Sequence, residues 1–234
     1  MTETRPHRLV LWDIDHTLVD YAGNGIAWYG AALTAATGAE FRTFPDFGGR
    51  TERAISADVL RLHGVEPDED AIQRLWRELI AAVERDRAKL PEAGRALDGA
   101  AAALADLAGQ DGVVQSLVTG NLPEISVHKL AAFGLDEHLD LEIGGYGSLS
   151  AHRPDLVPHA VKAASVKHGT EFAADAVVIV GDTPNDVEAA LDHGAIAVAV
   201  ATGRYSAGQL ADAGAHTVLP DLADLAAVRT AILR

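Results

Sequence analysis

The sequence of 234 residues contains no cysteine. Disulfide bonds, thiolate metal sites and thiol nucleophiles are therefore excluded. Long hydrophobic runs are also missing: no apolar stretch reaches the roughly 18 residues that a membrane span requires, and the opening MTETRPHR has no apolar signal segment. These absences predict a cytoplasmic enzyme or binding protein.

Positive charge is scarce as well. The chain has 19 lysine and arginine residues against 34 acidic ones, a formal net charge of −15. Phosphate backbones and anionic membranes are bound by clustered cations, so we expect no nucleic-acid partner and no membrane partner. With 48% hydrophobic and 23% charged residues, the composition is typical of a globular protein and does not indicate disorder. Most of the acids are expected on a solvated surface.

Four apolar runs rich in β-branched residues predict strands, at Arg8–Asp13, Val113–Gly120, Ala176–Asp182 and Ala195–Gly203. They are apolar almost throughout rather than alternating, which indicates burial on both faces. Helical stretches separate the last three runs. This order predicts an α/β fold with a doubly wound, parallel, Rossmann-like sheet.

The segment between the first two strands is far longer than one crossover helix needs. It predicts helices at Asn24–Thr37, Thr51–His63 and Asp68–Leu90, and helical signals resume at Leu97–Leu107 for the ordinary crossover. We therefore expect residues 21–94 to form an inserted all-helical domain. Residues 1–20 and 95–234 would form the α/β core.

Polar residues follow three of the predicted strands. Asp13 and Asp15 end the first, Thr119 ends the second, and Asp182 ends the third with Asp186 one turn later. Ligands bind beyond the carboxyl ends of strands in open parallel sheets. Side chains two apart in extended backbone point the same way, roughly 7 Å apart, so Asp13 and Asp15 would repel each other. Converging carboxylates are best tolerated around a hard divalent cation, and oxygen ligands favour Mg²⁺ over zinc.

Local structural roles could explain part of this pattern. Thr183 could cap a helix that begins at Pro184, with Asp186 completing the cap. Asn121 could similarly cap a helix, with Glu124 reaching back. Neither explanation accounts for Asp182 or Thr119. The Thr119 hydroxyl and the free N–H groups of Gly120 and Asn121 suit a phosphate or another small anion.

The segments DIDHTL, VTGN, AHRPDLV and GDTPND resemble, in this order, the four motifs of the haloacid dehalogenase (HAD) superfamily of hydrolases. The resemblance extends over nearly the whole chain. In that superfamily, phosphatases and phosphomutases have a second aspartate in the first motif and dehalogenases lack it. Asp15 occupies that position here, so the resemblance implies phosphoryl transfer.

The resemblance also implies a role for each residue. Asp13 would be the nucleophile that forms an aspartyl-phosphate, and Asp15 the general acid and then base. Mg²⁺ would be held by the Asp13 carboxylate, the Asp15 carbonyl and Asp182, with Asp186 a further ligand or an orienting partner. Thr119 would hydrogen-bond the phosphoryl group. Metal contact would keep Asp13 ionised while Asp15 holds a proton.

The basic motif departs from the family, whose common choice there is lysine. Arg153 is the best-placed residue, with Lys129 and Lys162 as alternatives. An arginine would retain the positive charge and would donate two parallel N–H groups to phosphate oxygens. His16 and His152 could contact the substrate, but a place in a tight turn explains each of them better.

The position of the insertion resembles the helical cap of phosphoglycolate phosphatase-like members. Within it, FPDFGGRTERAI resembles the cap's specificity loop. Gly49 and Arg50 would face the nucleophile, and Arg50 could hold a substrate carboxylate or a second anionic group. Solvated positions at a helix start explain Arg50 and Arg53 equally well.

The leading hypothesis is a Mg²⁺-dependent phosphatase for a small phosphorylated metabolite, acting as a monomer or homodimer. Phosphoglycolate and sugar phosphates are both compatible substrates. The alternatives are a phosphomutase of the same fold and a catalytically weak, phosphate-binding regulatory member. A response-regulator receiver is contradicted by the motif order and the large insertion.

Overall fold

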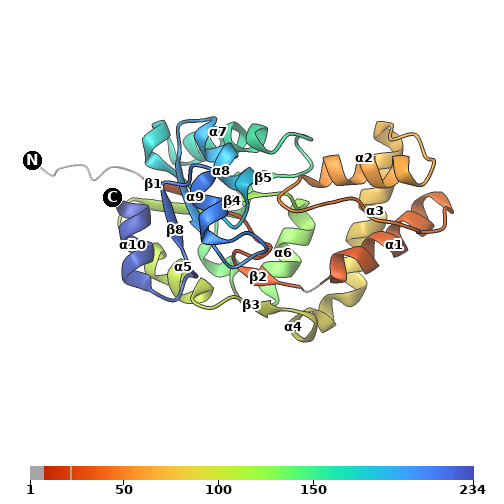
Figure 1. The fold of residues 1–234 in the computed structure, drawn as a ribbon, viewed down its shortest axis with the longest axis horizontal. Coiled ribbons are helices and arrows are strands. Elements are labelled where there is room, and N and C mark those ends of the chain that lie inside the picture. The colour runs from red at the N-terminus through yellow and green to blue at the C-terminus, as the bar shows by residue number, and fades with distance from the viewer. Residues whose placement is uncertain (1–7, 22) are drawn as a thin grey trace, which may run out of the picture.

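The computed structural model describes residues 8–21 and 23–234. Residues 1–7, which include most of the opening segment discussed above, and Ala22 lie outside the described part. A six-stranded sheet forms the core, in the order β5-β4-β1-β6-β7-β8 (Figure 1). Its strands are β1 Arg8–Trp12, β4 Val113–Thr119, β5 Gly145–Tyr146, β6 Val177–Gly181, β7 Ile196–Val200 and β8 Thr217–Leu219. All neighbouring strands of this sheet are parallel, which confirms the predicted sheet.

Helices cover both faces of the sheet. The core helices are α5 Ala100–Ala108, α6 Pro123–Ala131, α7 Leu156–His168, α8 Pro184–Leu191, α9 Ala207–Asp212 and α10 Leu225–Leu233. Short 3₁₀ turns are η2 Asp136–His138, η3 Leu141–Ile143, η4 Arg153–Asp155 and η5 Ala174–Ala176. Alternate residues of β1 point to opposite faces of the sheet. Leu9 and Leu11 pack with α7, α8 and α9. Val10 and Trp12 pack with α5 and α10. The strand is therefore buried on both sides, as its apolar run predicts.

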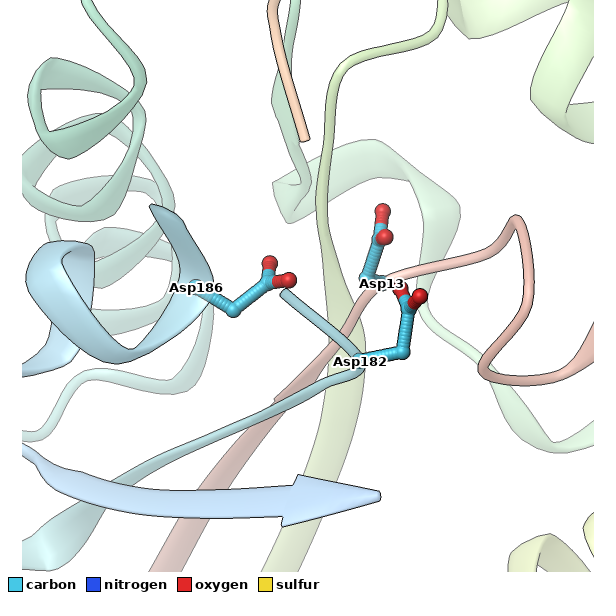
Figure 2. A group of neighbouring side chains, drawn as sticks. All are labelled: Asp13, Asp182 and Asp186. Carbon is cyan, nitrogen blue, oxygen red and sulfur yellow. The ribbon is translucent and has the colours of Figure 1, made fainter. Parts of the chain in front are cut away.

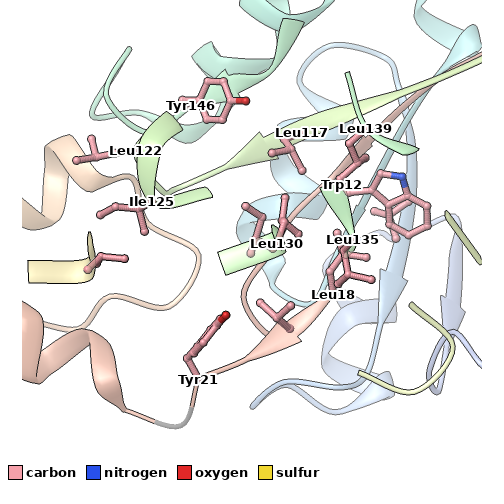
Figure 3. Packing of buried hydrophobic residues seen from close by; sticks show 14 of the residues in the cluster. Trp12, Leu18, Tyr21, Leu117, Leu122, Ile125, Leu130, Leu135, Leu139 and Tyr146 are labelled. Carbon is pink, nitrogen blue, oxygen red and sulfur yellow. The ribbon is translucent and has the colours of Figure 1, made fainter. Parts of the chain in front are cut away.

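The inserted segment is helical, as predicted, and lies to one side of the core (Figure 1). Its helices are α1 Asn24–Thr37, α2 Glu52–Leu62, α3 Glu69–Asp86 and α4 Leu90–Ala93, with η1 Arg87–Lys89 before α4. Two short antiparallel strands, β2 Val19–Asp20 and β3 Arg95–Ala96, pair where the chain leaves and re-enters the core. One apolar cluster continues from the core, through Tyr21 and Ile125, into the inserted helices (Figure 3).

Some predicted boundaries are wrong. The helix predicted over Asp68–Leu90 ends at Asp86, and η1 and α4 follow it. Pro91 has no N–H to donate to the preceding turn, which disfavours one continuous α-helix. The helix predicted from Leu97 begins at Ala100, after Gly99 turns the chain at a φ of 82°. Strands β5 and β8 were not predicted, because two or three residues are too short for an apolar run to identify.

Candidate active site

Three aspartates meet at the carboxyl edge of the sheet. Asp13 follows β1, Asp182 follows β6, and Asp186 lies in the first turn of α8 (Figure 2). The strands β1 and β6 are neighbours, so their ends bring residues 169 positions apart in the sequence together. One carboxylate oxygen of each residue lies within 4.8 Å of those of the other two. All three side chains are buried.

Arg153 provides the positive charge of this cluster. Its Nη2 lies 3.0 Å from Asp13 Oδ1 and 2.5 Å from Asp186 Oδ1. The side chain comes from η4, just before α7, and it is buried. Its Nη1 donates to the Gly49 carbonyl at 3.3 Å. Lys162, an alternative for the basic role, lies on α7 and lines a separate surface hollow.

Asp186 and Asp182 have different surroundings. Asp186 accepts hydrogen bonds from the Thr183 N–H and hydroxyl as well as from Arg153. The predicted capping box at α8 is therefore present, and the same carboxylate also contacts Arg153. The Asp182 carboxylate makes no hydrogen bond or ion pair within the described residues. A side chain at Gly203 would collide with it, because a Cβ there would lie 1.8 Å from Asp182 Oδ2.

The protein leaves these carboxylates short of positive charge. Burial, followed by repulsion from Asp186 and Asp13, raises the pKa of Asp182 to about 9. Burial also raises the pKa of Asp13 to about 6, although Arg153 opposes it. A cation bound among oxygen ligands would relieve both effects. The donor set of buried carboxylates therefore fits a hard divalent ion such as Mg²⁺.

Asp15 has its own cationic partner. Lys129 Nζ lies 2.7 Å from both Asp15 carboxylate oxygens, and Asn121 Nδ2 donates to Asp15 Oδ2 at 2.8 Å. The same Asn121 amide donates to the buried Thr119 hydroxyl at 2.9 Å. The interpretation of Asn121 as a helix cap is wrong: α6 begins after Leu122 without a side-chain cap, because the amide is engaged by Asp15 and Thr119.

The protein's own groups give Asp15 and Asp13 different proton affinities. Burial opposes ionisation of Asp15, but Lys129 and Asn121 outweigh it and lower the pKa of Asp15. Among the protein's own groups, burial gives Asp13 the raised pKa, and the prediction that Asp13 is the more acidic of the two concerns the metal-bound site. Burial is the largest cause of the Asp13 shift, and the one cation beside Asp13, Arg153, is shared with Asp186, whereas Lys129 contacts Asp15 at both oxygens.

A cavity of about 260 Å³ lies between the core and the inserted helices. Of the residues predicted for the site, it is lined by Asp13, Asp15, Gly49, Arg50, Gly120, Asn121, Arg153 and Asp182. Thr119 and Asp186 are buried and do not line it. The two predicted histidines differ: His16 lines the cavity from a left-handed turn with a φ of 58°, and the exposed His152 pairs with Asp155.

The loop between α1 and α2 closes one side of this cavity. Gly49 has a φ of 68° and packs so closely on Thr183 that a Cβ would lie 2.4 Å from its hydroxyl. Asn185 Nδ2 donates to the Gly48 carbonyl at 3.2 Å, and the Glu52 N–H donates to the Gly120 carbonyl at 2.8 Å. Arg50 also lines the cavity, but its Nη2 lies 2.7 Å from Asp58 Oδ2.

Sequence reasoning missed Glu52 as a cavity residue. Its buried carboxyl is hydrogen-bonded by the Tyr29 hydroxyl, which also lies 3.0 Å from Ser56 Oγ. Burial raises the pKa of Glu52 to about 7, although the Tyr29 hydrogen bond opposes the shift. An acidic residue in the first turn of a helix is common, so its sequence position carried no signal of this role.

A parallel α/β core with an inserted helical segment and an aspartate cluster at the strand ends defines the class of this protein. A family model of haloacid dehalogenase-like hydrolases matches residues 10–191. The chain therefore belongs to that family, which confirms the resemblance of its motifs. No functionally curated protein matches the sequence significantly.

Solved structures share the whole architecture. A hydrolase from Pseudomonas syringae is 24% identical, with 94% of this chain and 97% of that chain covered and a TM-score of 0.66. A predicted phosphoglycolate phosphatase from Haemophilus somnus is 20% identical, with coverages of 95% and 97% and a TM-score of 0.66. CbbY from Rhodobacter sphaeroides, solved with phosphate, is 20% identical, with coverages of 94% and 96% and a TM-score of 0.67. At these identities the likeness concerns the fold.

Proposed function

We propose that this protein is a Mg²⁺-dependent phosphatase that hydrolyses a small phosphomonoester through an aspartyl-phosphate on Asp13. The observation that carries the proposal is the placement of Asp13, which lines the cavity with Arg153 Nη2 3.0 Å away and Asp182 and Asp186 beside it. This arrangement provides a nucleophile, a cation for the phosphoryl oxygens and a set of metal ligands in one place. The similar structures described as a predicted phosphoglycolate phosphatase and as a complex with phosphate agree with it.

In the first step, an Asp13 carboxylate oxygen attacks phosphorus and the bond to the leaving oxygen breaks, while Asp15 gives that oxygen a proton. In the second, Asp15 takes a proton from water, which attacks phosphorus and releases phosphate and free Asp13. The contact with Lys129 favours the anionic form of Asp15, which the second step requires. A phosphate dianion that approaches Asp15 would raise its pKa and favour the protonated form needed first.

The metal would be held by Asp13, the Asp15 carbonyl and Asp182. The Asp182 carboxylate has both oxygens available, whereas Arg153 and Thr183 engage both oxygens of Asp186. Asp186 is therefore assigned as the partner that orients Arg153. When bound, Mg²⁺ supplies positive charge that lowers the pKa of Asp13 and neutralises the phosphoryl oxygens.

The inserted helices are proposed to act as a cap over the cavity, with boundaries at residues 21 and 94. The pairing of β2 with β3 at either end of this segment supports the division. In the described part, no helix combines the length and the hydrophobicity needed to cross a membrane. A cytoplasmic location and a monomeric or homodimeric state stay predictions.

The test is a Mg²⁺-dependent phosphatase assay over a panel of phosphorylated metabolites. We expect Asp13→Asn to lower kcat by at least about 10³-fold, because it removes a covalent nucleophile. Asp212→Asn, the same change at an exposed position of α9, should retain full activity. Undiminished turnover by Asp13→Asn would contradict the mechanism, and activity that resists EDTA would contradict the metal. Turnover that depends on an added sugar bisphosphate would indicate a phosphomutase instead.

A further inference from the structure

Aromatic side chains line the part of the cavity that the cap contributes. The chain contains only three Trp, four Tyr and five Phe. Five of these residues line the cavity and form an aromatic wall: Tyr21, Trp28, Tyr29, Phe44 and Phe47. Neighbouring rings contact one another, with centroids 4.9 Å apart for Tyr29 and Phe44 and 5.5 Å apart for Phe44 and Phe47. Phe47 keeps 46% of its surface exposed, so an apolar partner could still cover it.

The cations around the cavity are already paired with carboxylates of the protein. Arg50 pairs with Asp58 at 2.7 Å, and Lys129 with Asp15 at the same distance. Arg204 pairs with Asp46 at 2.9 Å. Arg153, the fourth lysine or arginine among the described lining residues, pairs with Asp13 and Asp186. A second anionic group on a substrate would therefore meet only lysine and arginine side chains whose charge a carboxylate of the protein already balances.

The charges that line the cavity leave no positive surplus for such a group. Four carboxyl groups line it, from Asp13, Asp15, Glu52 and Asp182, against the four cations named above. A bound Mg²⁺ and a phosphate dianion would also balance each other. The carboxyl group from the cap, Glu52, lies beside Tyr29 in the aromatic wall. It would repel an anion when ionised and offer it no positive charge when neutral.

We propose that this site selects phosphomonoesters whose leaving group is uncharged and aromatic or apolar, and that it discriminates against leaving groups that carry a carboxylate or a second phosphate. The inference rests on the proposed phosphatase function and specifies its substrate class. The aromatic wall would pack on the leaving group. A second anion would be desolvated beside cations whose charge is already balanced, so its desolvation cost would be poorly offset.

The direct test compares two esters that differ by one carboxylate, benzyl phosphate and its 4-carboxy derivative. With purified protein and Mg²⁺, we expect kcat/KM to be about tenfold or more higher for benzyl phosphate. Phosphoglycolate should likewise be a poorer substrate than benzyl phosphate. Equal or higher kcat/KM for the carboxylated esters would overturn the inference and leave the phosphatase function intact. No Mg²⁺-dependent hydrolysis of any ester, methyl phosphate included, would instead refute the proposed function.

Two variants test the two causes separately. Phe47→Ala should lower the ratio of kcat/KM for benzyl phosphate to that for methyl phosphate by about tenfold. Leu62→Ala, at a similarly exposed residue of α2 that does not line the cavity, should keep the ratio. Asp58→Asn removes the carboxylate partner of Arg50 and should raise activity on the 4-carboxy ester relative to benzyl phosphate. An unchanged ratio of benzyl to methyl phosphate in Phe47→Ala would overturn the role of the aromatic wall. Unchanged activity on the 4-carboxy ester relative to benzyl phosphate in Asp58→Asn would overturn the role of the paired cations.

Discussion

Asp13 and Asp15 are separated by a single residue, and each has a different cation. Arg153 contacts Asp13, and Lys129 contacts Asp15. Each of the two carboxylates therefore has a positive partner in the protein itself, although Asp13 shares Arg153 with Asp186. The pairing also distinguishes the two groups, because it lowers the pKa of Asp15 while burial raises that of Asp13. At the residue scale, Lys129 is the side chain that sets the protonation of the proposed general acid.

Replacement of Lys129 tests this role. In Lys129→Gln the amide can still bond to Asn121, but the charge that lowers the pKa of Asp15 is gone. The first step requires protonated Asp15, so we expect the basic limb of the kcat/KM pH profile to move to higher pH by about 1–3 units, the usual effect of a neighbouring opposite charge.

The matched control is Lys162→Gln on α7, which makes the same change at a separate surface hollow. Its pH profile should match that of the unmodified protein. A Lys129→Gln profile that also matches it would contradict the proposed link between Lys129 and Asp15.

At the scale of elements, the loop from α1 to α2 is fitted to the core at Gly49. The left-handed φ of 68° favours glycine, and Thr183 leaves no room for a Cβ. Thr183 belongs to the capping box of α8, so it is held in place by Asp186. The loop position is therefore tied to the helix that carries Asp186, the carboxylate that contacts Arg153.

Gly49→Ala should thus impair activity beyond its effect on stability. We expect kcat/KM to fall by about tenfold or more. The added methyl group would push the loop away from Thr183, so the loop would no longer close this side of the cavity. Unfolding free energy should fall by about 1–2 kcal/mol from the left-handed backbone alone. Enzyme kinetics and chemical denaturation measure the two effects.

Gly38 provides the control. It has a similar φ of 73° at the end of α1, but a Cβ there would meet nothing within 4 Å. Gly38→Ala should show a comparable loss of stability with normal kcat/KM. If both variants lose activity equally, strain rather than loop docking is responsible.

At the scale of the whole molecule, the aspartate cluster lowers stability when no cation is bound. A carboxyl group with a higher pKa in the folded state binds more protons when folded, so stability falls as pH rises between the two pKa values. For Asp13 and Asp182 this interval runs from the ordinary value of about 4 to about 6 and about 9. The metal-free protein should therefore lose stability from pH 5 to pH 8.

Mg²⁺ should reverse this loss. At a concentration about 100 times its Kd, we expect Tm to rise by about 5–10 °C at pH 8. The increase should be smaller at pH 5, where the metal competes with protons. Thermal unfolding with and without Mg²⁺ measures both values.

Asp182→Asn supplies the comparison for this experiment. Asparagine does not have to take up a proton when the protein folds, so metal-free Tm at pH 8 should rise and most of the Mg²⁺ effect should disappear. A larger Mg²⁺ effect at pH 5 than at pH 8 in the unmodified protein would refute the assignment.

The sequence by itself determined the features that depend on local pattern. The four main strands follow from their apolar runs, α1 from its helical pattern, and the capping box at α8 from the order Thr183, Pro184 and Asp186. The positions of Asp13 and Asp182 at the ends of parallel strands also follow, because such ends share one edge of a sheet. The family motifs add the hydrolase class.

Only the tertiary structure decided which charges meet. Lys129 and Asp15 are 114 residues apart, and no local pattern indicates that they form a pair. The family motif predicts a basic role for Arg153 but not its contact with Asp186. The same holds for the contact of Glu52 with Tyr29. In the sequence, Glu52 is an ordinary acidic residue at a helix start and Tyr29 an ordinary apolar position of another helix. Periodicity reports the face on which a residue lies, whereas ion pairing and pKa depend on distances and burial that arise when distant segments pack.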